Sequence, residues 1–161
     1  MGVVRAAEIP VARTPEGGYG SVMPPPVLTG CTEPLVDGAP DLRGTWRSVS
    51  VTWPEGTPAK HPDAMLEHVE RIEQCGDRLV VTSSGVVHDM RCDGTEEHGV
   101  HDVAAVGGQE IHVVATYEDG VHVLRPIGLP GVEVTRRLDA GQLVWSYAGL
   151  FTARLERVED P

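Results

Sequence analysis

Glycine-containing turns recur along the chain from Leu42 onward, and most neighbouring turns lie 8 to 11 residues apart. The segments between them are rich in valine, isoleucine and threonine, which favour extended backbone. This rhythm is typical of short antiparallel strands joined by tight turns, and no helix of ordinary length is needed. The turn glycines are Gly76, Gly85, Gly94, Gly120, Gly131, Gly141 and Gly149.

The sequence predicts about ten strands, and one segment also fits a helix. Apolar residues between Asp63 and Gln74 recur at helical spacing, but we predict only a short helical turn at 62–66 that leads into a strand. Ten short strands either pack as a sandwich or close into a barrel, and closure removes exposed edges. The predicted strands span 43–53, 67–75, 77–84, 86–93, 100–105, 109–117, 121–126, 132–138, 142–148 and 150–158.

Residues 1–40 have a different composition from the rest and are predicted to form an N-terminal Pro/Gly-rich arm before a barrel domain over 41–161. Seven of the 13 prolines and six of the 19 glycines lie in this arm. Proline fixes φ and lacks an N–H donor, so the arm cannot be a central strand or a long helix. It is either disordered or laid in extended form over the domain, where Val27 and Leu28 could dock.

Charge and cysteine content exclude some partners. The formal net charge of −11 argues against binding to nucleic acid or to an anionic membrane surface. No run of even twelve apolar residues occurs, and no signal peptide is visible, so we expect no membrane insertion. Three widely spaced cysteines, Cys31, Cys75 and Cys92, predict reduced thiols in a cytoplasmic protein, with Cys75 as a surface thiol in a turn.

Three stretches carry a resemblance to a known superfamily. Residues 42–49 contain a Gly-x-Trp opening strand, and residues 70–82 are similar to an "IEQ-x-GD" hairpin. Residues 134–158 resemble two closing hairpins in which one arginine precedes an "L-x-D-G" turn and a second lies in a "T-R-x-Y" strand. The three stretches occur in the family's order, so the chain resembles the calycin superfamily, in particular intracellular lipid-binding (fatty-acid-binding) proteins and lipocalins. The resemblance implies an all-β, antiparallel up-and-down barrel of about 8–10 strands that binds a small molecule in its lumen.

The chain also departs from that pattern. Only about a dozen residues, 54–65, occupy the place of the family's helical lid, so the arm could instead cross the barrel mouth. Glu156 stands where the family has a closing tyrosine, and nothing in the family matches the arm.

Arg136 and Arg154 occupy the positions of the family's two lumen arginines, which the resemblance implies hold a ligand carboxylate. A buried guanidinium needs an anion, and its planar fork fits a carboxylate. The alternatives are structural: Arg154 could stack on Trp46 at the barrel base, and Glu156 could neutralise either arginine.

If Arg136 points inward, strand alternation turns Val134 inward and Arg137 outward. The matching register in the next strand turns Trp145 and Tyr147 inward, which predicts a wall of large rings beside a buried cation. The alternative is a filled barrel in which these rings are core.

Histidines supply a second set of candidate residues. His88 shares a strand face with Met90 and Cys92, and His112 and His122 lie in adjacent strands. Neither a C-x-x-C nor an H-E-x-x-H spacing occurs, so we predict no metal and no cofactor, and haem or metal binding is a less favoured alternative.

The sequence therefore predicts a barrel that binds a small hydrophobic or amphipathic, anionic ligand. The main alternative is a small enzyme of isomerase, cyclase or lyase type, in which His112 or His122 pairs with Glu156 or Tyr147 across the lumen. The predicted ligand-binding residues are Arg136, Arg154, Trp145, Tyr147, His122, His112 and His88.

Overall fold

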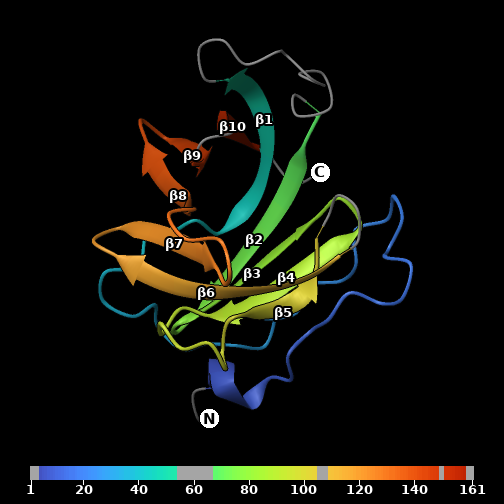
Figure 1. The fold of residues 1–161 in the computed structure, drawn as a ribbon. Coiled ribbons are helices and arrows are strands. Elements are labelled where there is room, and N and C mark those ends of the chain that lie inside the picture. Colours follow the sequence, from blue (N-terminus) through green and yellow to red (C-terminus); the bar gives the residue numbers. More distant parts are fainter. Residues whose placement is uncertain (1–3, 54–66, 105–108, 149–150, 159–161) are drawn as a thin grey trace.

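The computed structural model describes residues 4–53, 67–104, 109–148 and 151–158, which form a nearly closed antiparallel β-barrel with an arm on its outer wall (Figure 1). The predicted helical turn at 62–66 lies outside the described residues, whereas the competing helix is wrong from Val69 onward, because that segment is a strand. The strands are β1 (Gly44–Thr52), β2 (Val69–Cys75), β3 (Arg78–Ser83), β4 (Val86–Arg91), β5 (Val100–Val103), β6 (Glu110–Glu118), β7 (Val121–Pro126), β8 (Val134–Asp139), β9 (Gln142–Tyr147) and β10 (Phe151–Val158).

Each strand pairs with its neighbours in the chain, and β1 also pairs with β10. The exception is β4 and β5, which no ladder joins, and this break is here called the seam. At the seam the His88 ring contacts the Val103 carbonyl through Nε2 at 2.8 Å. The amide of Arg91 donates to the carbonyl of His98 at 2.8 Å. The predicted all-β, up-and-down topology is confirmed.

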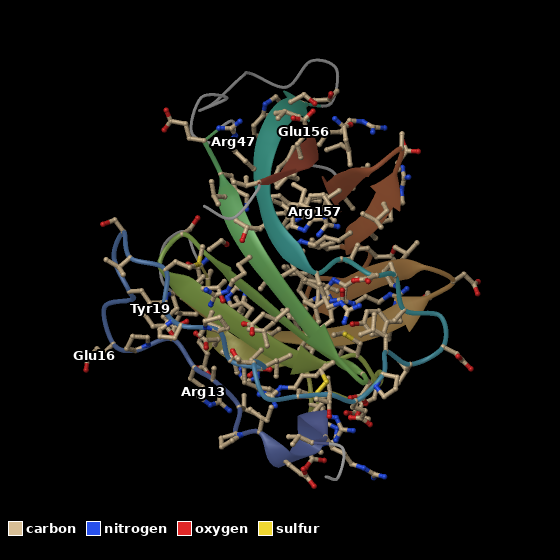
Figure 2. The ribbon with its side chains drawn as sticks, turned by 180° about the vertical axis from the view of Figure 1, so that it is seen from behind. Arg13, Glu16, Tyr19, Arg47, Glu156 and Arg157 are labelled. Carbon is tan, nitrogen blue, oxygen red and sulfur yellow. A yellow bond between two sulfur atoms is a disulfide. The ribbon has the colours of Figure 1, made fainter. Side chains whose placement is uncertain are left out.

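Trp46 closes one end of the barrel. Its ring is fully buried, and its indole Nε1–H donates to the Leu42 carbonyl at 2.9 Å. The Arg157 guanidinium lies 4.4 Å from the ring centroid, beside β1 in Figure 2. The stacking arginine is therefore Arg157, and the alternative that placed Arg154 on Trp46 is wrong. Gly44 has a φ of +142°, which residues with a side chain rarely adopt, and a Cβ there would meet Arg157 Nη1, so this position favours glycine.

The arm packs in extended form on the outer face of β2–β4, where Figure 2 shows Arg13, Glu16 and Tyr19. Its one helical feature among the described residues is a 3-10 turn, η1 (Ala6–Glu8). The arm covers β3 from outside while the barrel core covers it from inside, so β3 is buried on both faces. The apolar arm–wall contact, here called the outer core, consists of Ala6, Ile9, Ala12, Tyr19, Val27, Leu28, Cys31, Cys75, Val80 and Val87.

A buried arginine holds the start of the arm. Arg78 on β3 forms two bonds to Asp89 on β4, Nε to Oδ1 at 2.8 Å and Nη2 to Oδ2 at 2.5 Å. The remaining guanidinium N–H groups donate to the backbone carbonyls of Ala6, Ile9 and Pro10 at 2.6 to 2.9 Å. One side chain thus links the barrel wall to three points of the arm.

Further along, the arm crosses the seam between β4 and β5. The amide of Ala12 donates to Asp89 on β4 at 2.8 Å, and the amide of Thr14 donates to Asp102 on β5 at 2.9 Å. The amide of Tyr19 then donates to the Gly85 carbonyl at 2.8 Å, in the β3–β4 turn. The arm therefore bridges the seam and reaches the open end of the barrel at one edge.

A disulfide between Cys31 and Cys75 joins the arm to the β2–β3 turn. The prediction of three reduced thiols is wrong for this pair, and Cys75 is buried rather than a surface thiol. The arm folds back over the turn, a contact that cysteine spacing alone cannot show. Cys92 is free and buried. Because reduced thiols were the basis for predicting a cytoplasmic location, that argument no longer holds. None of the helices in the described segments is long and apolar enough to span a membrane.

We expect the Cys31→Ser/Cys75→Ser double variant to unfold more easily than the wild type. The two cysteines are separated by 44 positions, and opening a loop of that size lowers the free energy of unfolding by about 4 kcal/mol in the chain-entropy description. Urea unfolding followed by circular dichroism measures the change. Dithiothreitol should destabilise the wild type to the level of the double variant and leave the double variant unchanged. Equal stability of the two proteins under oxidising conditions would contradict the prediction.

Candidate functional site

Five side chains form a group on the lumen side of the barrel, here called the inner polar cluster: His68, Glu70, His122, Arg136 and Trp145. The alternation of β2 brings Glu70 inward, on the same buried face as Ile72. Strand register places three other members in a row, because His122 on β7 is opposite Arg136 on β8, and Arg136 is opposite Trp145 on β9. The predicted inward orientation of Arg136 and Trp145 agrees with this register.

An ion pair lies at the centre of the cluster. Arg136 donates to Glu70 through Nε at 2.8 Å and through Nη2 at 3.2 Å, and Glu70 is 0% exposed. Nε2 of His68 lies 2.7 Å from Glu70 Oε1. Burial opposes ionisation of Glu70, but the Arg136 charge and the His68 contact outweigh it and lower the pKa of this carboxyl to about 2. Glu70, not Glu156, therefore neutralises Arg136, and Glu156 is exposed.

His122 is enclosed in the barrel with unused hydrogen-bonding capacity. It is 0% exposed, and neither ring nitrogen has a hydrogen-bond partner among the described residues. Burial, together with the nearby Arg136 charge, lowers the pKa of the imidazole to about 3, so the ring is neutral near pH 7. Trp145 Nε1 and Ser48 Oγ are also buried, and neither atom has a hydrogen-bond partner among the residues that the structure describes. The cluster therefore combines a satisfied ion pair with unsatisfied neutral groups.

The neutral state of His122 predicts acid sensitivity. Between pH 6.5 and 4.5 the unfolded chain takes up a proton at this imidazole while the folded protein does not, so stability falls as the pH falls. The loss is at most about 1.4 kcal/mol per pH unit. Glu70, which faces the ring beside Arg136, stays ionised in this window. Burial lowers the pKa of His88 too, which adds in the same direction.

Urea unfolding of the wild type and of His122→Phe at several pH values measures this contribution. We expect a smaller loss of stability on acidification for the variant, which has no group to protonate at this position. Identical pH slopes for the two proteins would contradict the assignment of a neutral, buried imidazole.

An aromatic group lies next to the inner polar cluster, at the open end of the barrel. Phe151 is at its centre, with ring centroids 5.6 Å from Trp53, 4.9 Å from Trp145 and 5.9 Å from Tyr147. All four rings are half-buried. A register shift in β1 between Ser48 and Ser50 helps to form the group, because it changes the face that the following residues present.

Arg154 is not in the lumen, which corrects the orientation implied by the resemblance. It donates to Asp139 at 2.7 Å and to Gln142 at 3.1 Å on the outer face. The buried residues of β10 are its neighbours Ala153 and Leu155, so alternation turns Arg154 outward.

The predicted histidines also lie on different faces of the barrel wall. His112 is on the outer face, 43% exposed at the side chain, beside Glu110. His88 belongs to the face of β4 that includes buried Met90, and it bonds to Val103 at the seam. The predicted pairing of His112 with Glu156 across the lumen is therefore wrong, since both side chains are exposed. Among the described residues, no group of three His, Cys, Asp or Glu side chains is placed to hold a metal ion.

A cleft of about 630 Å³ lies between the arm and the barrel rim. Tyr19, Val22 and Met23 line it from the arm, and His68 and Thr82 line it from the wall. His68 therefore belongs to both the cleft and the inner polar cluster. Its ring also lies 4.8 Å from Trp145, which connects it to the aromatic group.

Glu70 and His68 were not among the predicted site residues. A signal for Glu70 was present, because Ile72 in the "IEQ" segment must face the core and Glu70 shares its face. Its partner Arg136 is 66 positions away, and only the closed barrel brings them together.

Comparison with known proteins identifies the fold. No protein-family model matches the chain, and no curated protein matches it. Among solved structures, zebrafish ileal bile acid-binding protein complexed with cholic acid matches with a TM-score of 0.54 and 20% identity, over 72% of this chain and 98% of that one. Human cRBP IV matches with a TM-score of 0.51 and 17% identity, over 73% and 98%. This chain has a calycin-type β-barrel fold.

The calycin-type barrel is also similar to the REP1-NXSQ fatty acid transporter, with a TM-score of 0.54 and 15% identity over 75% of this chain and 98% of that one. The matches cover almost the whole of each neighbour. At these identities they establish the shared barrel, and the ligand must be argued from this chain's own residues.

Proposed function

We propose that this calycin-type barrel binds a small hydrophobic or amphipathic molecule in its lumen. The apolar body of the ligand would pack on the aromatic group of Trp53, Trp145, Tyr147 and Phe151. Its polar end would lie at the inner polar cluster. Half-buried aromatic rings beside a few convergent polar groups are the usual composition of a small-molecule site.

The observation that carries the proposal is that both ring nitrogens of fully buried His122 lack a hydrogen-bond partner within the described part of the chain. A buried polar atom without a partner costs about 1–3 kcal/mol, and a bound polar group that supplies the missing bond removes this cost. The structural neighbours support the same function, because one is a bile acid-binding protein complexed with cholic acid and another is a fatty acid transporter. The enzymatic alternative has no comparable support, since His112 and Glu156 are exposed and His122 has no hydrogen-bond partner among the described residues.

Titration with Nile red, a neutral apolar dye that fluoresces in apolar surroundings, tests the proposal. We expect a saturable, one-to-one increase in fluorescence. Phe151→Ala should weaken binding about tenfold or more, because it removes the ring at the centre of the aromatic group. Leu129→Ala is the matched control, because Leu129 is an exposed apolar residue away from the lumen.

Two outcomes would contradict lumen binding. One is the absence of saturable fluorescence, and the other is a loss of binding in Leu129→Ala without a loss in Phe151→Ala.

A further inference from the structure

We infer that the lumen selects ligands whose polar end is uncharged and hydrogen-bonding, such as a hydroxyl, over ligands that end in a carboxylate. This inference rests on the proposed function and specifies its ligand class. It differs from the sequence-based expectation of an anionic ligand held by Arg136 and Arg154, because the structure places Arg154 outside the barrel and gives Arg136 a partner within the chain.

The guanidinium fork of Arg136 is already occupied. Its Nε and Nη2 donate to the two oxygens of Glu70, which is the arrangement that a ligand carboxylate would need. Its Cζ atom lies 4.8 Å from the Trp145 ring centroid, so the aromatic ring covers the guanidinium. A carboxylate could take the Nε/Nη2 face of this cation only by displacing Glu70, which is itself fully buried.

The charge of Arg136 is balanced without a ligand. The negative Glu70 offsets the positive Arg136, and His122 is a neutral ring. A ligand carboxylate would add an uncompensated negative charge beside Glu70 in a water-poor interior, which is costly. An uncharged polar group adds none.

The buried atoms that lack a hydrogen-bond partner among the described residues match an uncharged polar group. A neutral imidazole offers one donor and one acceptor, the Trp145 indole offers a donor, and the Ser48 hydroxyl offers both. Ser48 is adjacent to the cluster, since its amide donates to the His68 carbonyl at 2.9 Å. A hydroxyl can both donate to and accept from these atoms, whereas a carboxylate can only accept.

Displacement of Nile red by decan-1-ol and by decanoate at pH 7.4 tests this selection on the wild-type protein, because the two ligands share a chain and differ in the end group. We expect decan-1-ol to bind at least about tenfold more tightly, from the cost of burying an unpaired charge. Equal affinities, or tighter binding of decanoate, would overturn the inference while leaving lumen binding intact. If neither ligand displaces the dye, or the dye does not bind, the proposed function fails as well.

A second measurement uses Glu70→Gln, which frees Arg136 while keeping the size of the side chain. We expect decanoate affinity to rise about tenfold relative to decan-1-ol affinity in this variant. Glu118→Gln is the control, because Glu118 pairs with Arg125 on the surface and should change neither affinity. Unchanged decanoate affinity in folded Glu70→Gln would overturn the role assigned to Glu70. If the variant does not fold, the wild-type comparison still decides.

Discussion

Replacing Glu70 with glutamine is expected to lower the free energy of unfolding by about 3–5 kcal/mol, the usual cost of leaving one member of a buried ion pair without its partner. Arg136 would remain in the barrel interior with its positive charge uncompensated. Urea unfolding monitored by circular dichroism measures the change. Glu118→Gln, which breaks a surface pair with Arg125, should change the free energy of unfolding little.

A double variant separates the cost of an unpaired charge from the cost of changing the two side chains. Removing both charges in Glu70→Leu/Arg136→Met should recover most of the stability lost by Glu70→Gln, because no unpaired charge is left inside. A loss below about 1 kcal/mol for Glu70→Gln would show that water or a neighbour compensates Arg136.

Replacing Arg78 with methionine is expected to cost a similar amount, about 3–5 kcal/mol, and to release the start of the arm. The change leaves Asp89 buried without its cation and removes the donors to the carbonyls of Ala6, Ile9 and Pro10. Hydrogen exchange measured by mass spectrometry should show faster exchange of the amides that the arm buries, including Ala12.

Arg43→Met is the matched control for Arg78→Met. Arg43 pairs with Asp41 where both side chains are 55% exposed, so its loss should change stability little and leave exchange in the arm unchanged. If Arg78→Met kept the arm protected at wild-type levels, the outer core and the disulfide would be sufficient to hold it.

The strand pattern was predictable from sequence because each hairpin is local. All ten predicted strands are present with end differences of a few residues, since glycine turns and β-branched residues determine them over short distances. The inward orientation of Arg136 was implied by the resemblance, and that of Trp145 followed from its register opposite Arg136.

The errors involve orientation taken from a resemblance and contacts between distant segments. Arg154 was placed inward from the resemblance, but buried Ala153 and Leu155 set the opposite orientation. The pairing of Cys31 with Cys75 and the Glu70–Arg136 ion pair depend on the docked arm and on barrel closure, respectively. Neither is encoded in local spacing. The arm itself was left open between disorder and docking, because proline content excludes regular elements but does not choose a surface.

The path of the arm across the seam has a practical consequence for handling this protein. Ala12 binds Asp89 on β4 and Thr14 binds Asp102 on β5, so the N-terminal segment bridges the seam between these two strands. A shortened N-terminus would remove this bridge and expose two unpaired strand edges, and such edges can pair with other chains. Expression trials that begin the chain at Leu42 should therefore yield a barrel prone to self-association.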